Sequence, residues 1–172
     1  ITLKSLGKID EAETSFRQAL DLNKNYVEAL NNLGVLMQEQ GRLEESEASL
    51  QQMIALKPNY VDGINNLGIT LKGLGKLKKS EWHLRQAVSL SPQHAESHIN
   101  LGITLQELGR LREAEACYQQ ALKIKPDHVI AHNNIAFCLQ DYIWKTFHGI
   151  FKTESSFEKI IELERKRLLV RF

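Results

Sequence analysis

The chain has 172 residues, 42% of them hydrophobic and 25% charged, and its 22 Lys and Arg against 21 Asp and Glu give a formal net charge of +1. This composition is that of an ordinary folded protein and argues against a disordered chain, and the near-neutral charge argues against nucleic acid or a membrane surface as partner. Two cysteines, no secretory signal and no apolar run long enough to span a membrane favour a reducing, cytoplasmic setting. Because the first residue is Ile1 rather than methionine, we expect the chain to be a piece of a longer array or a truncated product.

The sequence repeats itself with a period of 34 residues. The letters NNLG at 31–34 return at 65–68, and close variants occupy 99–102 and 133–136. This spacing predicts a partial unit 1–26, three complete units 27–60, 61–94 and 95–128, the first half of another unit at 129–142, and a divergent tail at 143–172. We number positions within a unit from 1, starting at Val27, Val61 and Ala95 in the complete units.

Each unit predicts two helices. Apolar or small residues at positions 4, 7, 8 and 11 have helical spacing and predict a first helix, A. Position 15 is a glycine, suited to a left-handed turn after a helix: Gly7, Gly41, Gly75 and Gly109. Apolar residues at positions 17, 24, 28 and 30, with small residues at 20 and 27, predict a second helix, B. Proline at position 32 then ends it, at Pro58, Pro92 and Pro126.

This combination of small residues at positions 8, 20 and 27, a turn glycine and a late proline resembles the tetratricopeptide repeat from residue 1 to about residue 142. The resemblance implies an all-α fold, a right-handed α-solenoid of antiparallel helix pairs whose A helices line a concave groove. The sequence departs from the family at position 4, which is Leu30, Ile64, His98 and His132 instead of tryptophan.

Asparagine recurs where the A helices are expected to face away from the core. On a helical projection, positions 5, 6 and 9 all fall on this outer side. We therefore expect a groove that binds an extended peptide through amides at positions 5 and 6 and apolar groups at position 9. The candidate residues are Asn31, Asn32, Val35, Asn65, Asn66, Ile69, Asn100, Ile103, Asn133, Asn134 and Phe137.

The spacing of the amides favours a peptide ligand. Packed helices lie roughly 8 to 10 Å apart and an extended strand advances about 3.3 Å per residue, so one amide would meet about every third residue of a bound strand. The row resembles the asparagine ladder of O-linked N-acetylglucosamine transferases, which implies binding of extended protein substrates. Three alternatives stay open: solvated remnants of duplication, amides bonded to each other between helices, and position 9 packing on the adjacent repeat.

Other groove chemistry and catalysis are not expected. Chaperone-binding members of the family hold a terminal carboxylate with lysine at position 5 and asparagine at position 9, and neither is present here. The pairs His94 with His98 and His128 with His132 have a spacing that can hold a metal, but they occupy repeat positions, so no metal site is expected. No catalytic constellation stands outside the repeat pattern, and we expect no enzyme and no cofactor.

The tail from 143 to 172 leaves the repeat register, since Ile143 stands where the turn glycine belongs. Ser155 and Glu158 have the spacing of a capping box and predict a helix over 156–170. It would seal the stack, begin a further domain or bind a partner.

The sequence therefore predicts a non-catalytic scaffold that binds an extended or disordered protein segment of unknown identity. The alternative is the substrate-recruiting region of a larger glycosyltransferase-like enzyme whose catalytic domain is absent. A third hypothesis is end-to-end self-association through the open ends of the stack.

Overall fold

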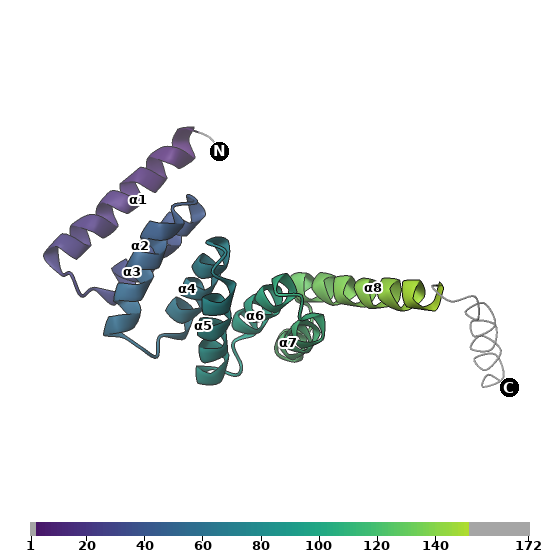
Figure 1. Ribbon diagram of the computed structural model, residues 1–172. Helices are drawn as coiled ribbons and strands as arrows, with labels where there is room; N and C mark the ends of the chain where they lie inside the picture. Colours follow the sequence, from purple (N-terminus) through teal and green to yellow (C-terminus); the bar gives the residue numbers. More distant parts are fainter. Residues whose placement is uncertain (1–2, 152–172) are drawn as a thin grey trace.

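The structure, a computed structural model, describes residues 3–151 and consists of helices throughout this part (Figure 1). Within it, each complete sequence unit holds one antiparallel helix pair. Their bounds are α1 Leu3–Leu22, α2 Val27–Glu39, α3 Leu43–Leu56, α4 Val61–Gly73, α5 Leu77–Leu90, α6 Ala95–Glu107, α7 Leu111–Ile124 and α8 Val129–Phe151. The all-α prediction is confirmed.

A glycine in the left-handed region closes each hairpin. Gly41, Gly75 and Gly109 have φ values of 75°, 70° and 74°, which side chains with a Cβ rarely adopt. The residue after the glycine then donates its backbone N–H to a carbonyl five residues back, as Arg110 does to Leu105 at 2.9 Å. The predicted turn at position 15 is therefore present in the three complete units.

Helices A and B of one unit approach closely at positions 8 and 24. A Cβ built on Gly34 or Gly68 would lie 2.6 Å from Cγ of Leu50 or Leu84, respectively. The residues at position 24 are fully buried, and they form the centre of the core with the predicted stripe of helix A, including Leu67 and Leu105.

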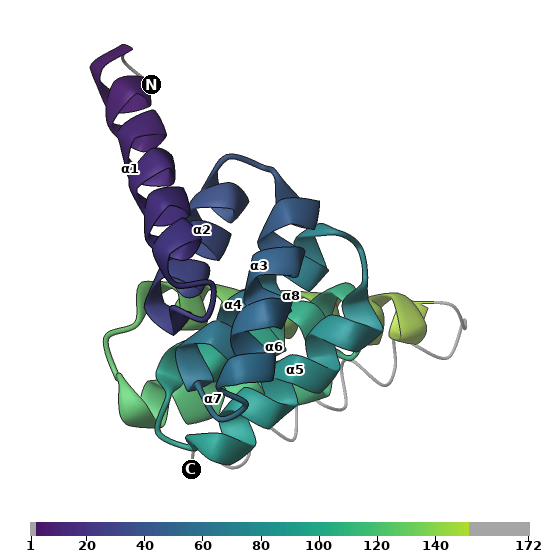
Figure 2. The same cartoon turned by 90° about the vertical axis from the view of Figure 1, so that its left-hand side faces the viewer.

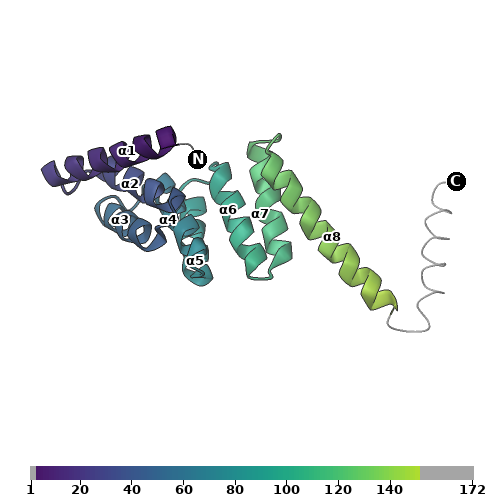
Figure 3. The same ribbon diagram turned by 90° about the horizontal axis from the view of Figure 1, so that it is seen from above.

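The stack of hairpins curves with its A helices on the inside. Helices α2, α4, α6 and α8 approach each other in succession, whereas among the described elements no Cα atom of α5 comes within 8 Å of a Cα atom of α3 or α7. Figure 3 shows the hairpins in a row from α1 to α8, and Figure 2 looks along this row from the α1 side. The face carried by α2, α4, α6 and α8, here called the A-helix face, is the concave side that the resemblance implied.

Both ends of the stack differ from the sequence prediction. Helix α1 runs through Gly7 without a turn, because the few residues before Gly7 cannot form a helix that packs back on α1. Helix α8 continues past residue 142 to Phe151, because the β-branched Ile143 replaces the glycine that a left-handed turn needs. The helix predicted over 156–170 lies outside the described residues.

The described helices do not have the features of membrane-spanning segments. None within residues 3–151 combines the length and the apolar character that spanning a bilayer requires.

Candidate functional site

The asparagines at position 5 do not face open solvent. Only 8% of Asn31 and 6% of Asn65 is exposed, and Ile99 at the same position is buried as well. The expectation that Asn31 and Asn65 line an open groove is therefore wrong. A helical projection considers one core direction, but each inner A helix also packs against the next A helix, and position 5 lies in that second contact. Asn133, in the last A helix, is exposed.

The buried amides form a ladder that links successive repeats. Asn66 Nδ2 donates to Asn31 Oδ1 at 3.2 Å, and Asn100 Nδ2 donates to Asn65 Oδ1 at 3.0 Å. The hydroxyl of Ser97 also donates to Asn65 Oδ1, at 3.3 Å. Of the alternatives left open by the sequence, the structure therefore shows amides bonded to each other between helices. We call these paired side chains the amide ladder.

The asparagines at position 6 lie on the concave surface with unused hydrogen-bonding groups. Asn32 is exposed, and Asn66, Asn100 and Asn134 are half-buried. Asn66 and Asn100 each use one amide hydrogen in the ladder, and within residues 3–151 their Oδ1 atoms accept no hydrogen bond. An asparagine amide has two donors and a carbonyl acceptor, so these side chains retain groups that can bind a peptide unit.

Apolar side chains at position 9 lie one turn further along the same helices. Val35, Ile69 and Ile103 are half-buried, and Phe137 is 51% exposed. Ile103 packs partly against the core cluster that contains Leu101. Ile103 thus combines packing on the core with surface that remains open, and the other three side chains also keep exposed surface.

Comparison with protein families assigns this architecture. Models described as "Tetratricopeptide repeat" match residues 27–57, 61–94 and 95–128, and a model described as "TPR repeat" matches residues 2–41. Together they extend over most of the chain. The chain belongs to the tetratricopeptide repeat family. No curated protein sequence matches it.

Solved structures show the same fold at low identity. The tetratricopeptide repeat chain has a TM-score of 0.75 and 21% identity to MamA, covering 96% of this chain and 94% of that one. The first tetratricopeptide domain of Spaghetti (RPAP3), bound to the HSP90 peptide SRMEEVD, has a TM-score of 0.66 and 20% identity to this chain. The match covers 68% of this chain and 93% of that one. The tetratricopeptide domain of Sgt2 from Aspergillus fumigatus has a TM-score of 0.68 and 11% identity, and the match covers 70% of this chain and 81% of that one.

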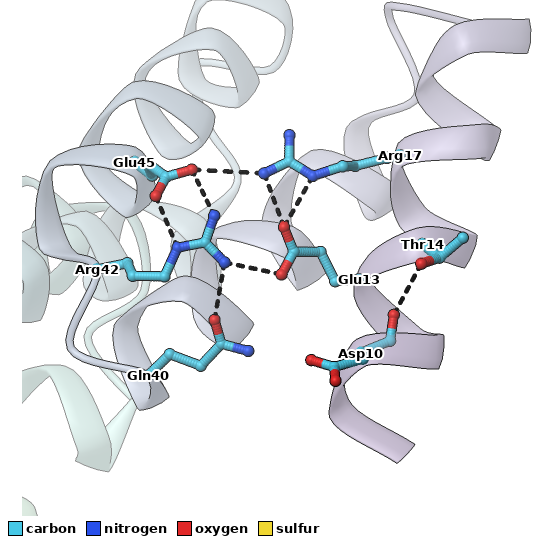
Figure 4. Close-up of polar contacts among 7 residues, drawn as sticks. All are labelled: Asp10, Glu13, Thr14, Arg17, Gln40, Arg42 and Glu45. Atoms are coloured by element: carbon cyan, nitrogen blue, oxygen red, sulfur yellow. Dashed lines mark hydrogen bonds and ion pairs between the residues drawn. The ribbon is translucent and has the colours of Figure 1, made fainter. Parts of the chain in front are cut away.

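A repeated ion pair also joins neighbouring tetratricopeptide units, on the side of the B helices. The cation at position 16 of one unit meets the glutamate at position 21 of the preceding unit: Arg42 with Glu13 at 2.7 Å, Lys76 with Glu47 at 2.6 Å, and Arg110 with Glu81. Figure 4 shows the first of these, extended by Arg17 and Glu45. Hydrogen bonds from Arg42 and then Arg17 lower the pKa of Glu13. Sequence analysis missed this series, although opposite charges at these two positions recur in the printed sequence.

Buried hydroxyl pairs form a further link that the sequence analysis missed. Ser46 Oγ lies 2.9 Å from Thr70 Oγ1, and Ser80 Oγ lies 3.1 Å from Thr104 Oγ1. Both pairs join position 20 of one tetratricopeptide unit to position 10 of the next. The sequence signal that could have indicated these pairs is serine at position 20, a polar residue in a position predicted to be buried.

The histidines stabilise the junctions between tetratricopeptide units. The Nε2 atoms of His98 and His132 lie 2.9 and 2.7 Å from the carbonyl oxygens of Pro92 and Pro126, so a protonated Nε2 donates to the preceding turn. His94 Nδ1 lies 2.7 Å from Ser97 Oγ. The part of the chain that the structure describes brings together no group of three or more potential metal-ligating side chains.

Proposed function

We propose that the chain is a non-catalytic protein-interaction scaffold that binds an extended segment of another protein along its A-helix face. The observation that carries this proposal is the pairing, in α4 and α6, of a position-6 amide that retains unused hydrogen-bonding groups with a partly open apolar side chain at position 9. Together these supply the hydrogen bonds and the apolar contact area that a peptide backbone and its side chains require.

The proposed set of binding residues is smaller than the set predicted from the sequence. The ladder uses the side chains of Asn31 and Asn65, so they support the groove from behind instead of contacting a ligand. The proposed contacts are Asn32, Asn66, Asn100 and Asn134 with Val35, Ile69, Ile103 and Phe137, and Asn133 adds an exposed amide at the C-terminal end. Each amide contact contributes only about 0.5–1.5 kcal/mol, so several repeats must act together.

The chemistry of the groove favours recognition of peptide backbone over recognition of a chain terminus. One structural neighbour is described with an HSP90 peptide bound, and in the family such acidic termini are held by a lysine at position 5. Here position 5 is buried asparagine or isoleucine in the three complete units, which supplies no cation to the groove. An internal extended segment is therefore the proposed ligand. The resemblance to the substrate-binding repeats of glycosyltransferases remains a hypothesis about a longer protein.

Selection of peptides by the chain tests this function. A library of random linear peptides is displayed against residues 1–172, and the affinities of selected peptides are measured by fluorescence anisotropy. The double variant Ile69→Ser with Ile103→Ser should weaken binding by about tenfold or more, which corresponds to about 1.4 kcal/mol.

A matched variant on the B helices provides the control. Leu56 and Leu90 occupy position 30 of their units and are 40% and 41% exposed. Changing both to serine removes apolar side chains with the same number of carbon atoms away from the A-helix face and should leave affinity unchanged. Failure to select any peptide, or equal losses in the two double variants, would overturn the proposal.

A further inference from the structure

Within residues 3–151, no helix B covers the last A helix, α8, on the face that the other A helices bury. Positions 4, 8 and 11 are buried in α2, α4 and α6. In α8 the same positions are His132, Ala136 and Leu139, and all three are exposed, Leu139 to 45%. Because α8 contacts α7 and α6 as α6 contacts α5 and α4, it is placed as a true helix A. An apolar face of this kind usually marks an interaction surface.

The first helix presents the opposite half of the same interface. Positions 20, 24 and 27 are fully buried in α3, α5 and α7. In α1 they are Ala12, Phe16 and Ala19, and each is only half-buried. Helix α1 contacts α2 as each helix B contacts the following helix A, so it is placed as a helix B, and no helix A precedes it among the described residues.

The two end helices also match in length. The inner A helices have 13 residues and the inner B helices 14, whereas α1 has 20 and α8 has 23. Helix α8 is extended at its C-terminal end and α1 at its N-terminal end, which are the two ends that meet at the turn of an ordinary hairpin. Packed antiparallel, α8 of one molecule and α1 of another would place both extensions side by side.

Two polar series of the inner repeats would continue across such a junction. In the amide ladder, position 6 donates to position 5 of the preceding unit. Asn32 Nδ2 makes no hydrogen bond within residues 3–151, and the amide of Asn133 is exposed, so the next rung would join Asn32 of one copy to Asn133 of the other.

The ion-pair series continues in the same register. Position 21 of the third complete unit is Glu115, and its side chain accepts a hydrogen bond from Gln119 on its own helix. Position 16 of the following unit in this chain is Trp144, which carries no charge. If α1 of a second copy supplied helix B, position 16 would be the exposed Lys8, and the pair would again be a cation with a glutamate.

We propose that α8 of one molecule packs against α1 of a second copy, so that the two helices complete a tetratricopeptide unit shared between molecules. The junction joins different surfaces of the two copies and leaves a free α1 and a free α8 at the ends. Such head-to-tail contacts do not stop at a dimer unless the chain of molecules closes into a ring. The rung would use Asn32 and Asn133, which are also proposed peptide contacts at the two ends of the A-helix face, and would leave the unused groups of Asn66 and Asn100 for a peptide.

Sedimentation velocity of residues 1–172 over a wide range of concentrations tests the proposal. The sedimentation coefficient should rise with concentration beyond the dimer value. Ala136→Glu places a charge on the exposed face of α8, and Ala12→Glu places one on the half-buried face of α1. Each variant alone should sediment as a monomer, whereas an equimolar mixture should form a dimer that grows no further, because each partner keeps one intact end.

Charge reversal provides a second test, at the exposed Lys8 and the half-buried Glu115. Lys8→Glu or Glu115→Lys alone should weaken association, and the two changes in one chain should restore it. A wild-type chain that stays monomeric, as it would if its own residues 152–172 covered α8, overturns the proposal. So does a mixture of the Ala136→Glu and Ala12→Glu variants that fails to dimerise while both retain the wild-type circular dichroism spectrum.

Discussion

The side chain of Asn100 donates to Oδ1 of Asn65 over 3.0 Å, and this bond joins α6 to α4. The same relationship, one repeat earlier, joins Asn66 to Asn31. Because repeat proteins have contacts only between neighbouring units, each such bond stabilises the interface on which cooperative folding depends. The asparagines that are most prominent in the sequence are thus in part structural.

Replacing Asn65 with alanine should destabilise the fold. Asn65 Oδ1 accepts from both Asn100 and Ser97 in a buried setting, so both donors would lose their partner. We expect the free energy of unfolding to fall by about 1–3 kcal/mol, measured by urea denaturation followed by circular dichroism.

Asn32→Ala is the matched control for this prediction. Asn32 is exposed and belongs to the same sequence motif, so its replacement should change stability by no more than about 0.5 kcal/mol. Equal effects of the two substitutions would show that the ladder contributes nothing to the interface between repeats.

Close packing at position 8 predicts that Gly102→Ala is destabilising. The added Cβ would lie 2.4 Å from Cε1 of Tyr118, a fully buried side chain whose hydroxyl donates to Gln106 at 2.9 Å. Alanine improves helix propensity by about 1 kcal/mol, but overpacking of this kind costs about 1–3 kcal/mol. We expect a lower urea midpoint, and a midpoint at or above that of wild type would mean that Tyr118 can move aside.

The turn glycines predict a different response, governed by backbone conformation. A Cβ on Gly109 would meet no atom within 4 Å, but its φ is 74°. Gly109→Ala should therefore cost about 1–2 kcal/mol through strain alone. Gly109→Asn should cost less, because asparagine tolerates the left-handed region better. Thermal melts of the two variants test this order. A Gly109→Ala variant that melts at the same temperature as the Gly109→Asn variant, or at a higher one, would contradict it.

The sequence predicts much of this fold because the repeat unit is a local pattern. The stripe at positions 4, 7, 8 and 11 and the turn glycine both act within one hairpin, where helical spacing and φ preference decide the outcome. Contacts between hairpins were harder to predict. A projection of one helix does not show that Asn31 and Asn65, the residues at position 5, face the next A helix. The break at Ile143 was visible, but its result, a continuous α8, depends on the absence of a competing turn.

Burial also determines the reactivity of the two thiols. It raises the pKa of both Cys117 and Cys138, so less thiolate is present at a given pH. Alkylation by iodoacetamide at pH 8 should be slower in the native protein than in urea at both residues, followed by mass spectrometry of digested samples. Native rates equal to those in urea would show that the C-terminal hairpins open readily.

The loss of stability at acidic pH should depend on Glu81. Burial on its own would raise the pKa of this carboxyl, but hydrogen bonds from Arg110 and Arg85 and their positive charges outweigh it, and the pKa lies below its ordinary value. A carboxyl with a lowered pKa in the folded state contributes stability above its unfolded pKa, about 4.3. That contribution is lost as the pH falls through the lower folded value.

Glu81→Gln should therefore make the melting temperature depend less on pH in the acidic range. At pH 7 the variant should melt at a lower temperature than wild type, because Arg110 and Arg85 lose an anionic partner at the junction of α5 and α7. As the pH falls below about 4.3 and through the lower folded pKa of Glu81, the two melting temperatures should converge, since protonation removes the same charge from the wild-type protein. The salt dependence is a further check, because these side chains are partly exposed and the difference at pH 7 should shrink in high salt. A constant difference across the whole pH range would mean that Glu81 acts through packing and not through its charge.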